Sequence, residues 1–221
     1  HVAEHLQLVA WIRRALKQQQ FEVYYQPQID LDSGRVVGAE ALLRWRHPEQ
    51  GMISPARFIP VAEHSGQIVE LGEWVLHQAC RQAQVWRTQG LDDVVISVNM
   101  SPVQARRGDM VRAVDDTLQA SGLPPTLLEL ELTESLLIDE TDQLTAMLAR
   151  LRSRGITFAI DDFGTGYSNL AYLKRFEVER LKIDQSFIRR LTVNPDDEAI
   201  VQAILQMAAA LKLGVIAEGV E

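Results

Sequence analysis

The sequence predicts an α/β fold built on a mostly parallel sheet, and three observations support this prediction. Short apolar runs rich in β-branched and aromatic residues alternate with amphipathic helical patterns almost to the end of the chain. The length of 221 residues is one that single α/β barrels reach without dividing. Hydrophobic residues at 47% and charged residues at 24% are ordinary for a globular protein, so disorder is excluded. We therefore expect a single domain over residues 1–221.

Seven runs have the length and composition of β-strands. They are Phe21 to Ile29, Val36 to Trp45, Val94 to Met100, Leu127 to Leu132, Ile156 to Ile160, Arg180 to Ile183 and Leu213 to Ala217. Helical patterns with apolar residues at three-to-four spacing separate most of them. We expect helices at Ile68 to Gln89, Met110 to Ala120, Gln143 to Arg154 and Glu198 to Leu211, after a leading helix that carries Leu6, Val9 and Leu16.

The first two strands are joined by only six residues, 30–35, which is too short for a crossover helix. They should form an antiparallel hairpin, so the predicted fold is a modified TIM (β/α)8-type barrel with an antiparallel first strand. Seven strands are one fewer than a closed barrel needs, and we expect a C-terminal closing segment beyond Glu221. Because the chain starts at His1 and not at Met, we expect it to be a piece of a longer multidomain protein.

Bulk properties exclude several classes of function. A net charge of −8 argues against duplex nucleic acid as a partner, because such binding depends on many Lys and Arg contacts to phosphate. Cys80 is the only cysteine, so neither a disulfide framework nor a thiolate metal cluster is expected. No apolar run approaches the roughly 18 residues of a membrane span. We expect a cytoplasmic domain without membrane contact of its own, with any membrane anchor in another part of the parent protein.

The stretch Asp161-Asp162-Phe163-Gly164-Thr165-Gly166 is the most informative part of the chain. Two adjacent carboxylates end an apolar strand, and carboxylates in such a place are costly unless something compensates them. A divalent cation is a common compensator. The alternative is a strand that ends in a polar turn, since Asp and Gly are ordinary turn residues.

Polar residues lie near the carboxyl end of almost every predicted strand, where barrel enzymes place their chemistry. They are Glu40, Asn99, Glu131, Asp161 with Asp162, Lys182 and Glu218. Glu, Asn and Asp are hard oxygen donors that suit Mg²⁺, Mn²⁺ or Ca²⁺, whereas the five histidines are scattered. Such a set could hold two cations and activate a water for phosphoryl displacement.

Lys182 is one of four lysines and has apolar neighbours, which favours a role inside the site over one on the surface. Its ammonium could orient a water or neutralise charge on phosphate, or it could simply pair with Asp184. Glu134 either supports the same neighbourhood or begins the following helix. The turn from Gly164 to Ser168 precedes a helix at Asn169 and could approach a phosphate, although this signal is weak.

At this point the motifs resemble a known family, the EAL domains, which are phosphodiesterases of the bacterial second messenger cyclic-di-GMP. Glu40-Ala41-Leu42 with Leu43-Arg44-Trp45 is similar to the motif that names the family. The other matching motifs follow in the family's order and cover essentially the whole chain. They are Tyr25-Gln26-Pro27, Val98-Asn99-Met100-Ser101 with Gln104, Glu131-Leu132-Thr133-Glu134-Ser135, Asp161 to Ser168, Leu181-Lys182-Ile183-Asp184 and Ala217-Glu218-Gly219-Val220-Glu221.

The resemblance implies hydrolysis of cyclic-di-GMP to linear 5′-pGpG, assisted by one or two Mg²⁺ or Mn²⁺ ions, with Ca²⁺ binding but supporting poor turnover. It implies that Asp161 and Lys182 hold the attacking water and that Glu134 anchors the loop from Asp162 to Ser168. The implied nucleotide contacts are Gln26, Leu43 and Arg44. The implied metal ligands are Glu40, Asn99, Glu131, Asp161 and Glu218, with Asp162 serving a second cation.

The resemblance also implies a homodimer formed through helices near the Asp161 loop, and an upstream sensor or diguanylate cyclase-like domain in the parent protein. A non-catalytic cyclic-di-GMP receptor is the alternative, although such members usually have a broken Glu-Ala-Leu or Asp-Asp motif. A third hypothesis, from residue types alone, is an enolase-like barrel with Lys182 as the base. The hairpin start and the Asp-Asp-Phe-Gly turn argue against it.

Overall fold

The computed structural model describes residues 2–138, 141–165 and 170–220. The chain forms two compact units, His1–Leu128 and Glu129–Glu221. The grouping of both into one domain remains a prediction. Among the described residues, no helix combines the length and the hydrophobicity that crossing a bilayer requires.

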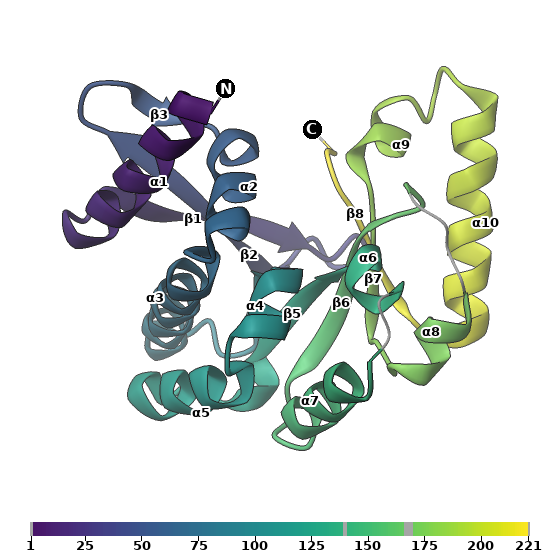
Figure 1. Ribbon diagram of the computed structural model, residues 1–221. Helices are drawn as coiled ribbons and strands as arrows, with labels where there is room; N and C mark the ends of the chain where they lie inside the picture. Colours follow the sequence, from purple (N-terminus) through teal and green to yellow (C-terminus); the bar gives the residue numbers. More distant parts are fainter. Residues whose placement is uncertain (1, 139–140, 166–169, 221) are drawn as a thin grey trace. The chain divides into compact units, whose positions relative to one another are not determined.

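The first unit contains a hairpin followed by a parallel strand (Figure 1). Strands β1 (Phe21–Ile29) and β2 (Val36–His47) pair antiparallel, which confirms the predicted hairpin. Its turn is held by Asp30, whose carboxylate accepts hydrogen bonds from the backbone N–H and the hydroxyl of Ser33. Strand β4 (Val95–Met100) pairs parallel with β2. A short strand β3 (Gly51–Ile53), which the sequence did not predict, pairs antiparallel with β2.

The helices of the first unit include two predicted ones close to their expected bounds, α3 (Ile68–Thr88) and α5 (Met110–Ser121). The remaining elements are α1 (Val2–Lys17), α2 (Pro55–Ser65), α4 (Pro102–Arg107) and a 3-10 turn, η1 (Pro125–Leu127). The core is aromatic: the rings of Phe21 and Phe58 lie 5.3 Å from the ring of Trp45, centroid to centroid. Leu8 and Ile12 of α1 belong to the same buried cluster, so α1 and α2 both pack against the hairpin.

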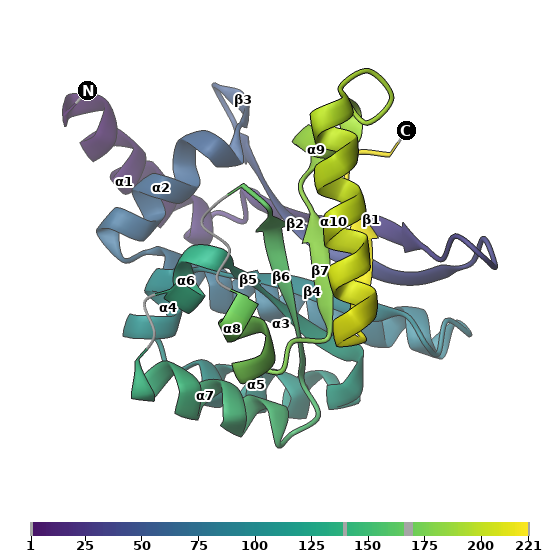
Figure 2. The ribbon, with the colours of Figure 1, turned by 90° about the vertical axis from the view of Figure 1, so that its right-hand side faces the viewer.

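The second unit is a parallel sheet in the order β5-β6-β7-β8. Its strands are β5 (Leu128–Thr133), β6 (Thr157–Phe163), β7 (Arg180–Ile183) and β8 (Gly214–Ala217). Its helices are α6 (Glu134–Ile138), α7 (Asp142–Arg152), α8 (Leu170–Arg175), α9 (Gln185–Arg189) and α10 (Pro195–Leu211). Helix α10, seen lengthwise in Figure 2, packs against α9 and β8. The parallel pairs confirm the predicted α/β class.

Alternation gives strands β5 and β7 one apolar and one charged face each, because successive side chains of a strand point to opposite sides. In β5 the leucines Leu128, Leu130 and Leu132 are all buried in the core, and the intervening positions are Glu129 and Glu131. In β7 the apolar Leu181 and Ile183 alternate in the same way with two cations. The charged face therefore carries paired acids and bases at successive levels of the sheet.

Candidate metal centre

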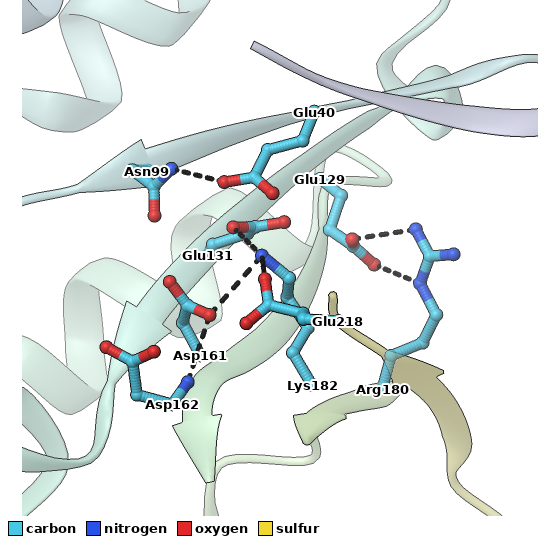
Figure 3. A network of polar contacts seen from close by, with 9 residues as sticks. All are labelled: Glu40, Asn99, Glu129, Glu131, Asp161, Asp162, Arg180, Lys182 and Glu218. Atoms are coloured by element: carbon cyan, nitrogen blue, oxygen red, sulfur yellow. Dashed lines mark hydrogen bonds and ion pairs between the residues drawn. The ribbon is translucent and has the colours of Figure 1, made fainter. Parts of the chain in front are cut away.

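At the centre of the charged face, the ammonium of Lys182 forms ion pairs with three carboxylates (Figure 3). Its Nζ lies 2.7 Å from Glu131 Oε2, 2.8 Å from Glu218 Oε1 and 3.3 Å from Asp161 Oδ1. Lys182 is only 1% exposed, so water does little to screen these interactions. One cation therefore holds carboxylates from β5, from β6 and from the residue that follows β8.

The parallel arrangement explains why these side chains meet. Asp161 stands opposite Thr133, two residues beyond Glu131 on β5, and Lys182 stands opposite Ile216, two residues before Glu218. Parallel strands bring their carboxyl ends to one edge, so residues at the ends of different strands share a site. Asp184, the alternative partner of Lys182, instead caps α9: its carboxylate accepts a hydrogen bond from the backbone N–H of Ser186 at 2.8 Å.

A second carboxylate group overlaps the first. Asp161, Asp162 and Glu218 each offer an oxygen, and these oxygens all lie within 4.8 Å of one another. The backbone N–H of Asp162 donates to Asp161 Oδ1 at 2.9 Å, which fixes the two aspartates side by side. Asp162 has a φ of 54°, a left-handed conformation that Asp adopts more readily than most residues and that re-aims its side chain.

Charge crowding at this group perturbs its acidity. Partial burial, and then repulsion from the carboxylate of Asp161, raise the pKa of Asp162 from 3.8 to about 7. Asp184 takes part through a hydrogen bond with Asp162. Burial works against ionisation of Asp184 as well, but the hydrogen bonds from Ser186 lower its pKa overall. Four acidic groups around one ammonium leave an excess of negative charge that a divalent cation would neutralise.

The donor set fits a hard cation. All offered atoms are carboxylate oxygens, the ligands that Mg²⁺, Mn²⁺ and Ca²⁺ prefer. Burial first, and then repulsion from Asp161, disfavours the charged form of Asp162 in the metal-free protein. The second unit thus supplies a site where a divalent ion would replace a proton.

Glu134 is the first residue of α6, directly after β5. It is buried, and its Oε1 accepts a hydrogen bond from the hydroxyl of Tyr172 on α8 at 2.9 Å. This bond ties the segment after β5 to the segment after β6. After Asp162 the chain turns at Gly164 (φ 97°), and Thr165 donates its hydroxyl to the carbonyl of Asp162 at 2.8 Å. The predicted turn residues Gly166 to Ser168 lie outside the described residues.

The first unit carries the other predicted ligands. Asn99, at the end of β4, donates its amide to Glu40 Oε1 at 2.9 Å, and Glu40 is buried on β2. Gln26 stands opposite Glu40 in the antiparallel pair, so both side chains share a face. Arg44 is on the same face by alternation, and its guanidinium lies over the ring of Tyr24, 5.6 Å from the centroid. The two units thus contain one predicted group each.

Leu43 differs from the other predicted contacts of the nucleotide. Alternation places its side chain on the face opposite Glu40 and Arg44, where it packs against the core of the first unit. Its backbone carbonyl instead accepts a hydrogen bond from Arg44 at 3.0 Å. The position therefore supports the conformation of Arg44 through the main chain.

Sequence reasoning missed three residues around the site: Tyr172, Glu129 and Arg180. Glu129 and Arg180 form a two-pronged ion pair next to the Lys182 cluster, with both distances 2.7 Å (Figure 3). The signal was present, because Leu-Glu-Leu-Glu and Arg-Leu-Lys place two acids and two bases at a spacing of two residues. Tyr172 had no such signal, since its partner lies 38 residues away in the sequence.

The chain is similar to known proteins over almost its whole length. A family model described as EAL domain matches residues 9–221. The bifunctional diguanylate cyclase/cyclic di-GMP phosphodiesterase MucR of Pseudomonas aeruginosa is 45% identical over 218 residues, and the cyclic di-GMP phosphodiesterase NbdA of the same organism is 44% identical over 218. Each match covers 99% of this chain but only 32% of MucR and 28% of NbdA, so the chain spans about a third of these relatives.

A solved structure of the PaMucR phosphodiesterase in complex with c-di-GMP superposes with a TM-score of 0.93 at 45% identity. The match covers 97% of this chain and 87% of that one. This likeness confirms the predicted fold class, an α/β fold of the modified TIM-barrel type with an antiparallel first strand. With a family model over almost its whole length and relatives above 40% identity, the chain belongs to the EAL domain family.

Proposed function

We propose that this chain hydrolyses one phosphodiester bond of cyclic-di-GMP to give linear 5′-pGpG, in a reaction that requires Mg²⁺ or Mn²⁺. The observation that carries the proposal is the Lys182 ammonium held by three carboxylates, beside the Asp161-Asp162 pair. Relatives that are 45% and 44% identical are named as cyclic di-GMP phosphodiesterases, and the superposed PaMucR structure is a c-di-GMP complex. A chain that only bound the nucleotide would have no chemical need for this set.

The proposed metal ligands are those that the family motifs imply. We propose Glu40, Asn99, Glu131, Asp161 and Glu218 as ligands of one cation. Asp162 would serve a second cation, which would displace the proton that its raised pKa allows it to keep near neutral pH. When bound, such ions would neutralise charge on the phosphate and lower the pKa of a coordinated water.

The side chains of this chain do the remaining work in the proposal. Asp161 accepts a hydrogen bond from the attacking water, and Lys182 turns the N–H of its longest contact, the one to Asp161 at 3.3 Å, to the water oxygen, which aims a lone pair at phosphorus. Because Lys182 is buried, its ammonium also stabilises negative charge that develops on the phosphate more strongly than an exposed lysine could. Glu134 keeps the segment after Asp162 in place through Tyr172.

The nucleotide would be held by the polar face of the hairpin. Gln26 and Arg44 share that face with Glu40, and a guanidinium suits phosphate or the acceptor edge of a guanine. Leu43 would act here through its carbonyl bond to Arg44. We further propose a homodimer formed through helices near the Asp161 loop, a sensor or cyclase-like domain upstream in the parent protein, and a cytoplasmic location.

The test is a direct assay of the folded chain. Purified protein would be incubated with cyclic-di-GMP and Mg²⁺, Mn²⁺ or Ca²⁺, and the nucleotides would be separated by chromatography. We expect 5′-pGpG with Mg²⁺ and Mn²⁺ and little product with Ca²⁺, because the larger, looser coordination of Ca²⁺ positions a water less well. Calorimetric binding without any cleavage would select the receptor alternative and reject the enzyme.

A further inference from the structure

A second ion pair lies on the charged face of the second unit, and the proposed reaction does not use it. Arg180 Nε donates to Glu129 Oε2 and Arg180 Nη2 donates to Glu129 Oε1, both at 2.7 Å. Glu129 is 1% exposed and the Arg180 side chain 21%. Each residue precedes a member of the Glu131–Lys182 pair by two positions on the same strand, so the two pairs form successive rungs between β5 and β7 (Figure 3).

The local packing is suited to this arrangement. Strand β6 lies between β5 and β7, and at this level it presents the small side chain of Ala159, so both cations can reach across it. On the other side, a Cβ on Gly214 would come within 3.1 Å of Arg180 Cγ. The absence of a side chain at that position leaves room for the stem of Arg180.

The register makes a wrong pairing possible. Ala159 is the partner of Glu131 on β5 and of Arg180 on β7, so Arg180 begins level with Glu131 and not with Glu129. Conversely, the Lys182 ammonium is bound to Glu131, and Glu129 lies only two residues, about 7 Å along β5, before Glu131. If either Glu129 or Arg180 lost its charge, the other would become a competitor for a member of the upper pair.

We propose that Glu129 and Arg180 are positioning residues for the site: by binding each other, they reserve Glu131 and Lys182 for the pair that meets Asp161 and Glu218. Only the kinetic part of this inference rests on the proposed function. The pairing itself is a property of the metal-free protein and can be measured there.

The experiment is a double-mutant cycle of R180M, E129M and the double variant, with R190M as the matched control. Arg190 forms an ion pair of the same 2.7 Å length with Asp197, next to α10. The first readout is the NMR signal of the Lys182 ammonium in metal-free protein, assignable because the chain has four lysines. The second is cyclic-di-GMP turnover per folded molecule with Mn²⁺.

We expect each single variant to shift the Lys182 signal, to speed its proton exchange and to lower turnover about tenfold, whereas the double variant returns both to within about threefold of the unmodified chain. R190M should change neither readout. An unchanged Lys182 signal in folded R180M and E129M would overturn the inference, as would equal losses in the single and double variants.

If R180M does not fold, R180Q takes its place under the same criteria. If the unmodified chain shows no turnover but the NMR cycle holds, the proposed function fails while the positioning role stands. If the unmodified chain turns over cyclic-di-GMP but the variants leave the Lys182 signal unchanged, the positioning role fails while the proposed function stands.

Discussion

Replacing Lys182 by methionine should separate rate from metal affinity. In the metal-free protein Nζ holds three carboxylates at 2.7, 2.8 and 3.3 Å, and none of the four side chains is more than 25% exposed. Removing one partner of a buried ion pair costs roughly 3–5 kcal/mol. We therefore expect K182M to lose about that much unfolding free energy without metal and to regain a large part of it when Mg²⁺ is added.

The same change should raise, not lower, the affinity for a divalent ion. Two unit charges 4 Å apart interact by about 4 kcal/mol at an effective dielectric constant of 20, so removing a positive charge from the carboxylate cluster favours another cation. We expect about tenfold tighter Mn²⁺ binding by calorimetry, while turnover falls about 10²- to 10³-fold, as when a donor to a developing negative charge is removed. Parallel losses of affinity and rate would refute this reasoning and make Lys182 a structural ion-pair partner.

Four other predictions concern Asp162, Glu40 and Tyr172. Mn²⁺ affinity measured by calorimetry should rise up to tenfold per pH unit until about pH 7 and then level off, because below its raised pKa Asp162 binds a proton that the ion must displace; D162N should abolish this dependence. For the same reason Asp162 favours the metal-free fold most below about pH 4, and this contribution is lost as pH rises through 7, so denaturation midpoints should fall over that range in the unmodified chain but not in D162N. E40Q, which can still accept the hydrogen bond from Asn99, should weaken Mn²⁺ binding and lower turnover by orders of magnitude with little change in thermal stability, whereas an unfolded E40Q would show that the Glu40 carboxylate is structural. Y172F should lower the free energy of unfolding by about 1 kcal/mol in calorimetry and reduce turnover severalfold. Full activity of Y172F would show that the bond between Tyr172 and Glu134 does not support the catalytic segment.

Much of the fold was predictable because strand signals are local. All seven predicted strands are present with bounds shifted by at most a few residues, and the six-residue connection was sufficient to predict the hairpin. The missed elements are short or atypical. Strand β3 has three residues, and α2 contains Pro60 in its interior, which obscures a helical pattern. Such segments take their structure from tertiary packing, as Phe58 of α2 does against the aromatic core.

The candidate site was predictable at the level of residue types but not of partners. Parallel strands share an edge, so carboxylates at their ends could be expected to meet. Whether Lys182 would pair with Asp184 or with more distant acids could not be decided, because the choice depends on where β7 ends. The strand ends at Ile183, and Asp184 turns away to begin α9. Lys182 is therefore left facing the neighbouring strands.

The arrangement of charges suggests why the site keeps a lysine at all. The lower rung, Glu129 with Arg180, is a balanced pair, whereas the upper level places Glu131, Asp161 and Glu218 around a single ammonium. A second fixed cation would reduce the negative charge of the upper level and would repel a divalent ion. With one ammonium the cluster keeps a net negative charge, and partial burial together with repulsion from Asp161 raises the pKa of Asp162 to about 7. The excess of negative charge around Lys182 therefore favours a metal ion at the carboxyl ends of the strands. Two residues earlier on β5 and β7, the pair of Glu129 and Arg180 has no such excess.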